Sequence, residues 1–138
     1  MNIRNFPRIV MVETLLFPVQ FLLGMAVNLF ITIPDPIVAK FFDSVRGVLV
    51  DLHVLNGLTI ITLAIIIMLL TRQFKTPLPF RFSIFATLSI ILAITGGVIF
   101  LFLGQVDAFS YTMSIGFAGA VVIYFFMGRA VMQAQQIR

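Results

Sequence analysis

Four long apolar runs, separated by short polar segments, dominate the pattern of the chain. They cover approximately Ile9–Ile33, Val48–Leu70, Phe82–Leu103 and Phe109–Met127. Each is close to the roughly 20 residues that a helix needs to cross a bilayer. Their apolar residues are continuous rather than alternating, which excludes the strands of an outer-membrane barrel. The pattern predicts an all-α, four-helix membrane bundle that forms a single domain over residues 1–138.

The segments between the runs contain helix-breaking residues: "PDP" at 34–36, "TPLP" at 76–79 and "GQVD" at 104–107. Because the last connection is very short, the third and fourth helices are expected to be antiparallel neighbours. The first connection is longer, and "DPIVAKFFDSVRGVL" has apolar residues on one helical face and charges off it. It predicts a short amphipathic helix on the outer membrane interface.

Composition supports a membrane protein. Hydrophobic residues make up 61% of the chain and charged residues 10%, against about 45–50% and about 25% in soluble domains. The net charge is +4, but the basic residues stand singly at the edges of apolar runs, which argues against a nucleic-acid partner. The first run is too long for a signal peptide and is expected to be a retained helix.

The basic residues also predict orientation. If all four runs cross the membrane, seven basic residues fall on one side of it, and two, Lys40 and Arg46, fall on the other. The seven are Arg4, Arg8, Arg72, Lys75, Arg81, Arg129 and Arg138. The positive-inside rule then places both termini in the cytoplasm, as expected for a multi-pass protein of the cell membrane.

Polar residues interrupt the first run at regular positions. Glu13, Gln20, Gly24 and Asn28 fall within an arc of about 80° at 100° per residue. Since lipid offers no hydrogen-bond partner, this stripe is expected to face the bundle. Pro18 removes one backbone hydrogen bond and is expected to kink the helix.

A second polar face lies on the second run, where His53, Asn56 and Gly57 are spaced i, i+3 and i+4. His53 and Asn28 each lie about five residues from the outer end of their run, roughly 7.5 Å deep at 1.5 Å per residue. The spacing therefore predicts that Asn28 and His53 meet near the outer leaflet.

His53 is the only histidine, and two roles are open to it. It could ligate haem iron or relay a proton, although a bis-histidine haem or a zinc site would need ligands that a chain with no second His and no Cys lacks. It could instead form an interhelical hydrogen bond, the more common role of such residues. Gln20, Asn28 and Asn56 could likewise bind a ligand or bridge helices.

Glu13 also has two interpretations. A carboxylate in a first helix could carry a proton or bind a cation, as in small drug exporters, but this chain has no Trp of the kind those exporters carry. Alternatively, Glu13 could reach the cytoplasmic interface and pair with Arg8 or Arg81, which is the favoured prediction.

The third and fourth runs contain small or weakly polar residues. Gly116 and Ala120 have a small-xxx-small spacing that permits close helix approach. No catalytic triad, phosphate loop, metal motif or carboxylate dyad is present, which favours a non-enzymatic role.

The run "QFLLGMAVNLFITIP" at 20–34 resembles the first-helix signature of a family of small, functionally uncharacterised four-helix bacterial membrane proteins. Further similarities are His53 and Gly57, "GGVIFL" at 96–101, and Ser110, Met113 and Tyr124. The family often carries histidines near an HPG turn in its outer loop, whereas this chain reads "PDPIVAKFFD". Any ligand held by those histidines would not be held here.

The leading hypothesis is a non-enzymatic membrane protein whose outer-leaflet cavity, near Asn28, His53 and Asn56, binds a small amphiphile or a partner subunit. One alternative is a haem- or quinone-associated redox protein with His53 as ligand. The other is a small proton-coupled transporter that uses Glu13 and acts as a homo-oligomer.

Overall fold

The computed structural model describes residues 6–30, 45–102 and 106–136, and is all-α. Its elements are α1 (Phe6–Phe30), α2 (Val45–Thr71), α3 (Leu78–Phe102) and α4 (Asp107–Gln136). All four helices are long and apolar enough to span a membrane, as predicted. The predicted interfacial helix falls mostly on residues 31–44, outside the described residues.

The helix bounds differ from the apolar runs. α1 and α2 each begin three residues before their runs, and α4 continues nine residues past Met127, while Phe30 is the last residue of α1 that the structure describes. Hydropathy marks where a chain meets lipid, whereas a helix continues as long as its backbone hydrogen bonds do. A depth predicted by counting from the end of a run therefore changes where the helix extends beyond the run.

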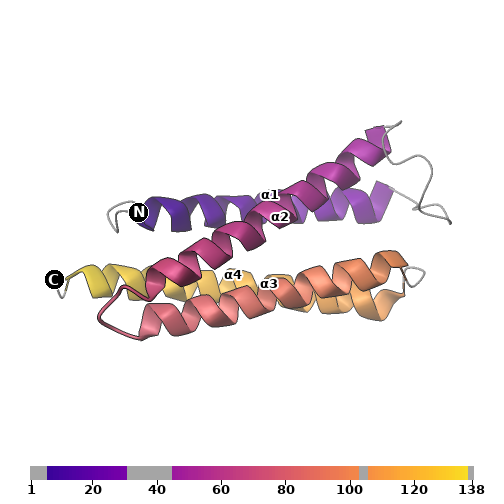
Figure 1. Ribbon diagram of the computed structural model, residues 1–138. Coiled ribbons are helices and arrows are strands. Elements are labelled where there is room, and N and C mark those ends of the chain that lie inside the picture. Colours follow the sequence, from indigo (N-terminus) through magenta and orange to yellow (C-terminus); the bar gives the residue numbers. More distant parts are fainter. Residues whose placement is uncertain (1–5, 31–44, 103–105, 137–138) are drawn as a thin grey trace.

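The four helices form two hairpins (Figure 1). α3 and α4 lie side by side along their lengths, which confirms the predicted antiparallel pair. α2 crosses the bundle obliquely, with its first part beside α1 and its last part beside α3. The start of α1 and the end of α4 lie at the same end of the bundle as the turn between α2 and α3.

The apolar core lies mainly at that end of the bundle. Its buried residues come from the first half of α1 and α3, the second half of α2, and the part of α4 from its middle onward. They are Phe6, Val10, Phe17, Ile60, Ala64, Ile67, Leu70, Ala86, Ile90, Ala120, Tyr124, Met127 and Val131. Phe17 joins the hairpins, because its ring centroid lies 5.2 Å from that of Tyr124 and 5.7 Å from that of Phe117.

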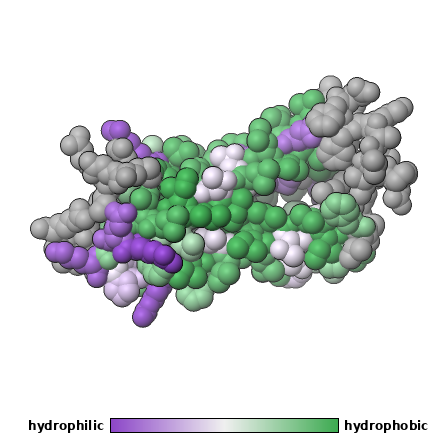
Figure 2. Space-filling view, in the orientation of Figure 1, coloured by the Kyte–Doolittle hydropathy of each residue, from purple (hydrophilic) through white to green (hydrophobic). Residues whose placement is uncertain are grey.

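Figure 2 shows an apolar surface over most of the bundle, with hydrophilic residues gathered mainly at the end that holds the core. The basic residues whose side chains the structure describes are exposed and belong to that end: Arg8, Arg72, Lys75, Arg81 and Arg129. Large apolar side chains such as Leu22, Leu58 and Phe125 are more than half exposed. An apolar surface of this extent is typical of lipid contact.

Glycines hold α3 against α4. A β-carbon built on Gly116 would lie 2.6 Å from the amide nitrogen of Ala93, and one on Gly96 would lie 2.8 Å from that of Met113. Neither distance is possible for a real side chain, so the backbones are in direct contact. The small-residue spacing at Gly116 and Ala120 therefore does mark a close approach, and Ala120 is fully buried.

Candidate functional site

Three polar side chains meet between α1 and α2. The Asn56 amide nitrogen donates to the Gln20 side-chain oxygen at 2.8 Å and to the Leu16 carbonyl at 3.2 Å. The Gln20 amide nitrogen lies 3.2 Å from each ring nitrogen of His53. We call Gln20, His53 and Asn56 the amide–histidine cluster. The predicted polar faces of both helices therefore do contact each other.

The Leu16 carbonyl fixes the direction of every hydrogen bond in the cluster. A carbonyl only accepts, so the Asn56 group that faces it is the NH₂ group. The same NH₂ group faces Gln20, whose oxygen must therefore accept. The Gln20 NH₂ group is then left to donate to His53, which must present an unprotonated ring nitrogen to it.

One N–H group of His53 has no acceptor among the residues that the structure describes. A neutral imidazole carries one N–H, and an amide NH₂ cannot accept a hydrogen bond. Among the residues that the structure describes, the His53 ring is hydrogen-bonded only to the Gln20 amide nitrogen. The side chain is half-buried, so this N–H can meet a group from outside the chain.

Glycines make room for the cluster. A β-carbon on Gly24 would lie 3.1 Å from Cε1 of His53, and one on Gly57 would lie 3.4 Å from the Gln20 amide nitrogen. Gly24 therefore faces α2, as its place in the polar stripe predicts. Both positions accept only a small residue while the histidine and the glutamine lie between the helices.

The predicted contact between Asn28 and His53 is wrong. The His53 ring lies beside Gln20 and Gly24 of α1, whereas Asn28 lies four residues, about 6 Å along the helix, beyond Gly24. Gln20 and Gly24 are at the matching depth, and they are the α1 residues that contact the ring. Asn28 is exposed, so the polar stripe turns away from the other helices at its outer end.

Glu13 lies in the core rather than at the interface. Its side chain is 0% exposed, and neither carboxyl oxygen has a hydrogen-bond partner in the described part of the chain. Arg8 and Arg81 are both exposed, and neither pairs with it. The expectation that Glu13 reaches the interface is therefore wrong, because the other helices close over the face of α1 that carries it.

Tyr124 of α4 is the polar neighbour of Glu13 that the sequence did not reveal. It is 2% exposed, and its hydroxyl interacts electrostatically with the carboxyl without completing a hydrogen bond of good geometry. A tyrosine deep within an apolar fourth run was the available signal. Its partner could not be named, because the rotation of α4 about its axis depends on packing against α3.

The donor set limits the chemistry of the site. No group of three or more His, Cys, Asp or Glu residues is close enough to hold a metal ion within residues 6–30, 45–102 and 106–136. His53 and Glu13 belong to separate places, since Glu13 lies two helical turns from Gln20 on α1. The arrangement can donate a hydrogen bond at His53 and can hold a proton at Glu13.

Comparison with known proteins gives no match to a protein-family model, a curated protein or a solved structure.

Proposed function

We propose that the chain is a non-enzymatic, multi-pass membrane protein that binds a small amphiphile at the amide–histidine cluster. The supporting observation is the N–H group of His53 that has no acceptor among the described residues. In a bilayer a polar group without a partner costs several kcal/mol, so an acceptor oxygen supplied by a ligand would be favoured there. The amphiphile would offer a carbonyl, ester or quinone oxygen to His53 and its apolar part to the surrounding helices.

A quinone with a ten-carbon chain is a suitable probe, and an alkylbenzene of similar length is its matched compound without an acceptor. We expect the purified protein to bind the quinone about tenfold more tightly, as one neutral hydrogen bond of about 1.4 kcal/mol would give. His53→Phe keeps a ring but removes the donor, and should abolish this preference. Native mass spectrometry in mild detergent measures both affinities.

A preference for the quinone that persists in His53→Phe would contradict the proposal. A Soret band in the purified protein that disappears in His53→Ala would instead establish the haem alternative. The geometry favours the amphiphile, because an iron ligand must offer a nitrogen lone pair and the Gln20 amide already lies 3.2 Å from both ring nitrogens. A partner subunit is a further possible source of the acceptor, and would appear as a stable oligomer without ligand.

Glu13 supports a second function, a proton-coupled transporter. A carboxyl group that is 0% exposed and has no hydrogen-bond partner in the described part of the chain is costly as an anion, and such groups in membrane helices often carry protons. In this role Glu13 would exchange a proton and Tyr124 would orient the carboxyl. Proton uptake into proteoliposomes that contain a pH-sensitive dye should be lost in Glu13→Gln, and uptake that is unchanged in this variant would remove the function.

The orientation in the membrane belongs to the same proposal. The end with the five exposed basic residues would face the cytoplasm of the cell membrane, as the positive-inside rule requires. Because the chain has no Cys, a single Arg129→Cys substitution gives an unambiguous label. A membrane-impermeant maleimide applied to intact cells should leave it unmodified, and labelling would reverse the assignment.

A further inference from the structure

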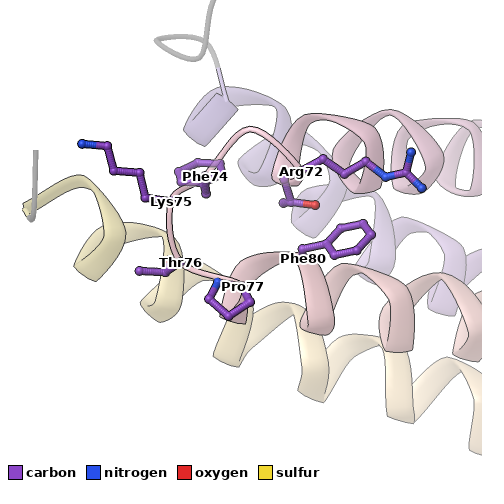
Figure 3. A pocket seen from close by; sticks show the side chains of 7 residues that line it. Arg72, Phe74, Lys75, Thr76, Pro77 and Phe80 are labelled. Atoms are coloured by element: carbon purple, nitrogen blue, oxygen red, sulfur yellow. The ribbon is translucent and has the colours of Figure 1, made fainter.

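A second candidate site lies at the turn between α2 and α3. It is an open cavity of about 500 Å³, lined by Thr71, Arg72, Phe74, Lys75, Thr76, Pro77 and Phe80. Figure 3 shows Arg72 extending toward the Phe80 ring and Lys75 extending outward from the turn. This cavity is independent of the amide–histidine cluster and of Glu13.

The position of the cavity brings it level with lipid head groups. The apolar span of α2 ends at Thr71 and that of α3 begins at Leu78, so the lining residues stand where hydrocarbon gives way to polar head groups. This holds for either orientation in the membrane. A ligand in the cavity could therefore keep its acyl chains in the bilayer.

The charge of the cavity is unbalanced. It contains two cations and no carboxylate, and none of the five exposed basic residues at this end forms an ion pair with a described residue. The three acidic residues of the described chain lie elsewhere: Glu13 in the core, and Asp51 and Asp107 near the opposite ends of their helices. An anion from outside the chain would supply the missing charge.

Contacts among neighbouring residues fix the side chains that line the cavity. Thr71 and Ser83 share a buried hydrogen bond of 2.8 Å between α2 and α3. Phe74 packs against Phe6 of α1, with ring centroids 5.1 Å apart. The Arg72 guanidinium lies 5.4 Å from the centroid of the Phe80 ring, which supports it by a cation–π contact.

The donors suit a phosphate group. A guanidinium can offer two parallel N–H donors to phosphate oxygens, and a lysine adds a mobile positive charge. The hydroxyl of Thr76 makes no hydrogen bond to any described residue and can donate as well. We infer that this cavity binds the phosphate of an anionic phospholipid head group, held by Arg72, while Lys75, which extends the opposite way from the turn, adds a mobile positive charge.

The test is lipid retention by the full chain, measured by native mass spectrometry after exchange into vesicles of phosphatidylglycerol or phosphatidylcholine. We expect phosphatidylglycerol to be retained at least tenfold more strongly. The double variant Arg72→Gln, Lys75→Gln should lose this preference. The matched control Arg8→Gln, Arg129→Gln removes the same charge from the same end but leaves the cavity intact, and should stay within twofold of the original chain.

Two further arms complete the test. Arg72→Lys keeps the charge but not the paired donors, and should fall between the original chain and the double variant. Equal losses in the cavity variant and its control would show that charge acts without a site and would overturn the inference. Competition by millimolar inorganic phosphate as strong as that by the lipid would also overturn it, in favour of a soluble phosphate ligand. Circular dichroism confirms that each variant folds.

Discussion

The two hairpins are held together by opposite means. Between α3 and α4 the contact is backbone against backbone, at Gly96 and Gly116, and no interhelical hydrogen bond is needed. Between α1 and α2 the contact includes hydrogen bonds among Gln20, His53 and Asn56, and side chains rather than backbone lie against Gly24 and Gly57. A contact between backbones at glycines leaves no side-chain donor or acceptor over. A hydrogen-bonded contact can leave one donor without an acceptor, as at the His53 N–H among the described residues.

This difference explains where function can reside. In lipid, helices gain little from burying apolar surface, so close van der Waals contact and hydrogen bonds must hold them. The α3–α4 pair is held by close van der Waals contact, and Gly96 and Gly116 at that contact carry no functional group. The α1–α2 pair uses hydrogen bonds, and the same groups that join the helices can bind a ligand. Three substitutions test this division.

Gly116→Leu should have the largest effect. Its side chain would meet the Ala93 backbone at a distance where no atom fits, so α3 and α4 must separate. We expect the free energy of unfolding to fall by about 3 kcal/mol, measured by titration with sodium dodecyl sulfate in mixed micelles. Gly128→Leu is the matched control, because a β-carbon there meets nothing within 4 Å. Equal losses in the two variants would refute the backbone contact.

Gln20→Leu should have an intermediate effect. It removes the central member of the amide–histidine cluster and leaves Asn56 and His53 without their partner. We expect a loss of about 1 kcal/mol in the same titration, since interhelical hydrogen bonds in membranes are individually modest. Asn28→Leu, on the exposed face of the same helix, should cause no measurable loss. A cost at Asn28 as large as that at Gln20 would place the helix contact elsewhere.

Thr71→Val should have the smallest effect, and it tests the junction between the hairpins. It deletes the hydroxyl that meets Ser83 of α3, but Ser83 keeps its hydrogen bond to the Phe80 carbonyl. We expect a loss of about 0.5 kcal/mol. Thr62→Val deletes a hydroxyl that bonds only within its own helix, to Leu58, and should change stability less. A larger loss of stability in Thr62→Val than in Thr71→Val would mean that the hydrogen bond between Thr71 and Ser83 does not stabilise the protein.

The sequence was sufficient for the coarse architecture and for the faces of the helices. Continuous apolar runs define four helices, and helical spacing alone puts Gln20 and Gly24 on the face toward α2. The depth of individual polar residues along their helices was predicted less well. Asn28 was matched to His53 by counting from the ends of apolar runs, but α2 begins three residues before its run, and His53 lies beside Gln20 and Gly24 instead. Because a helix rises about 1.5 Å per residue, the four residues between Gly24 and Asn28 amount to about one turn.

The burial of Glu13 was beyond sequence reasoning for a different reason. A carboxylate two turns into a helix can reach an interface or be enclosed. Which of the two occurs depends on whether other helices pack over the face of the helix that carries it. Here α4 places Tyr124 beside it and the core closes around both. That outcome depends on contacts between residues more than 100 positions apart, which local pattern does not contain.

The place of Glu13 also has a consequence for the assembly of the protein during synthesis. Its helix leaves the ribosome first, while Tyr124 is in the last of the four. A charged residue at the centre of a membrane helix costs about 3 kcal/mol on insertion, and Glu13, two turns from the start of α1, carries part of that cost. For most of translation the carboxyl must therefore rest in the translocation channel, at the membrane surface or in the bilayer as the neutral acid. Closure of the core around Glu13 becomes a late step, which can begin only when the final helix has entered the membrane.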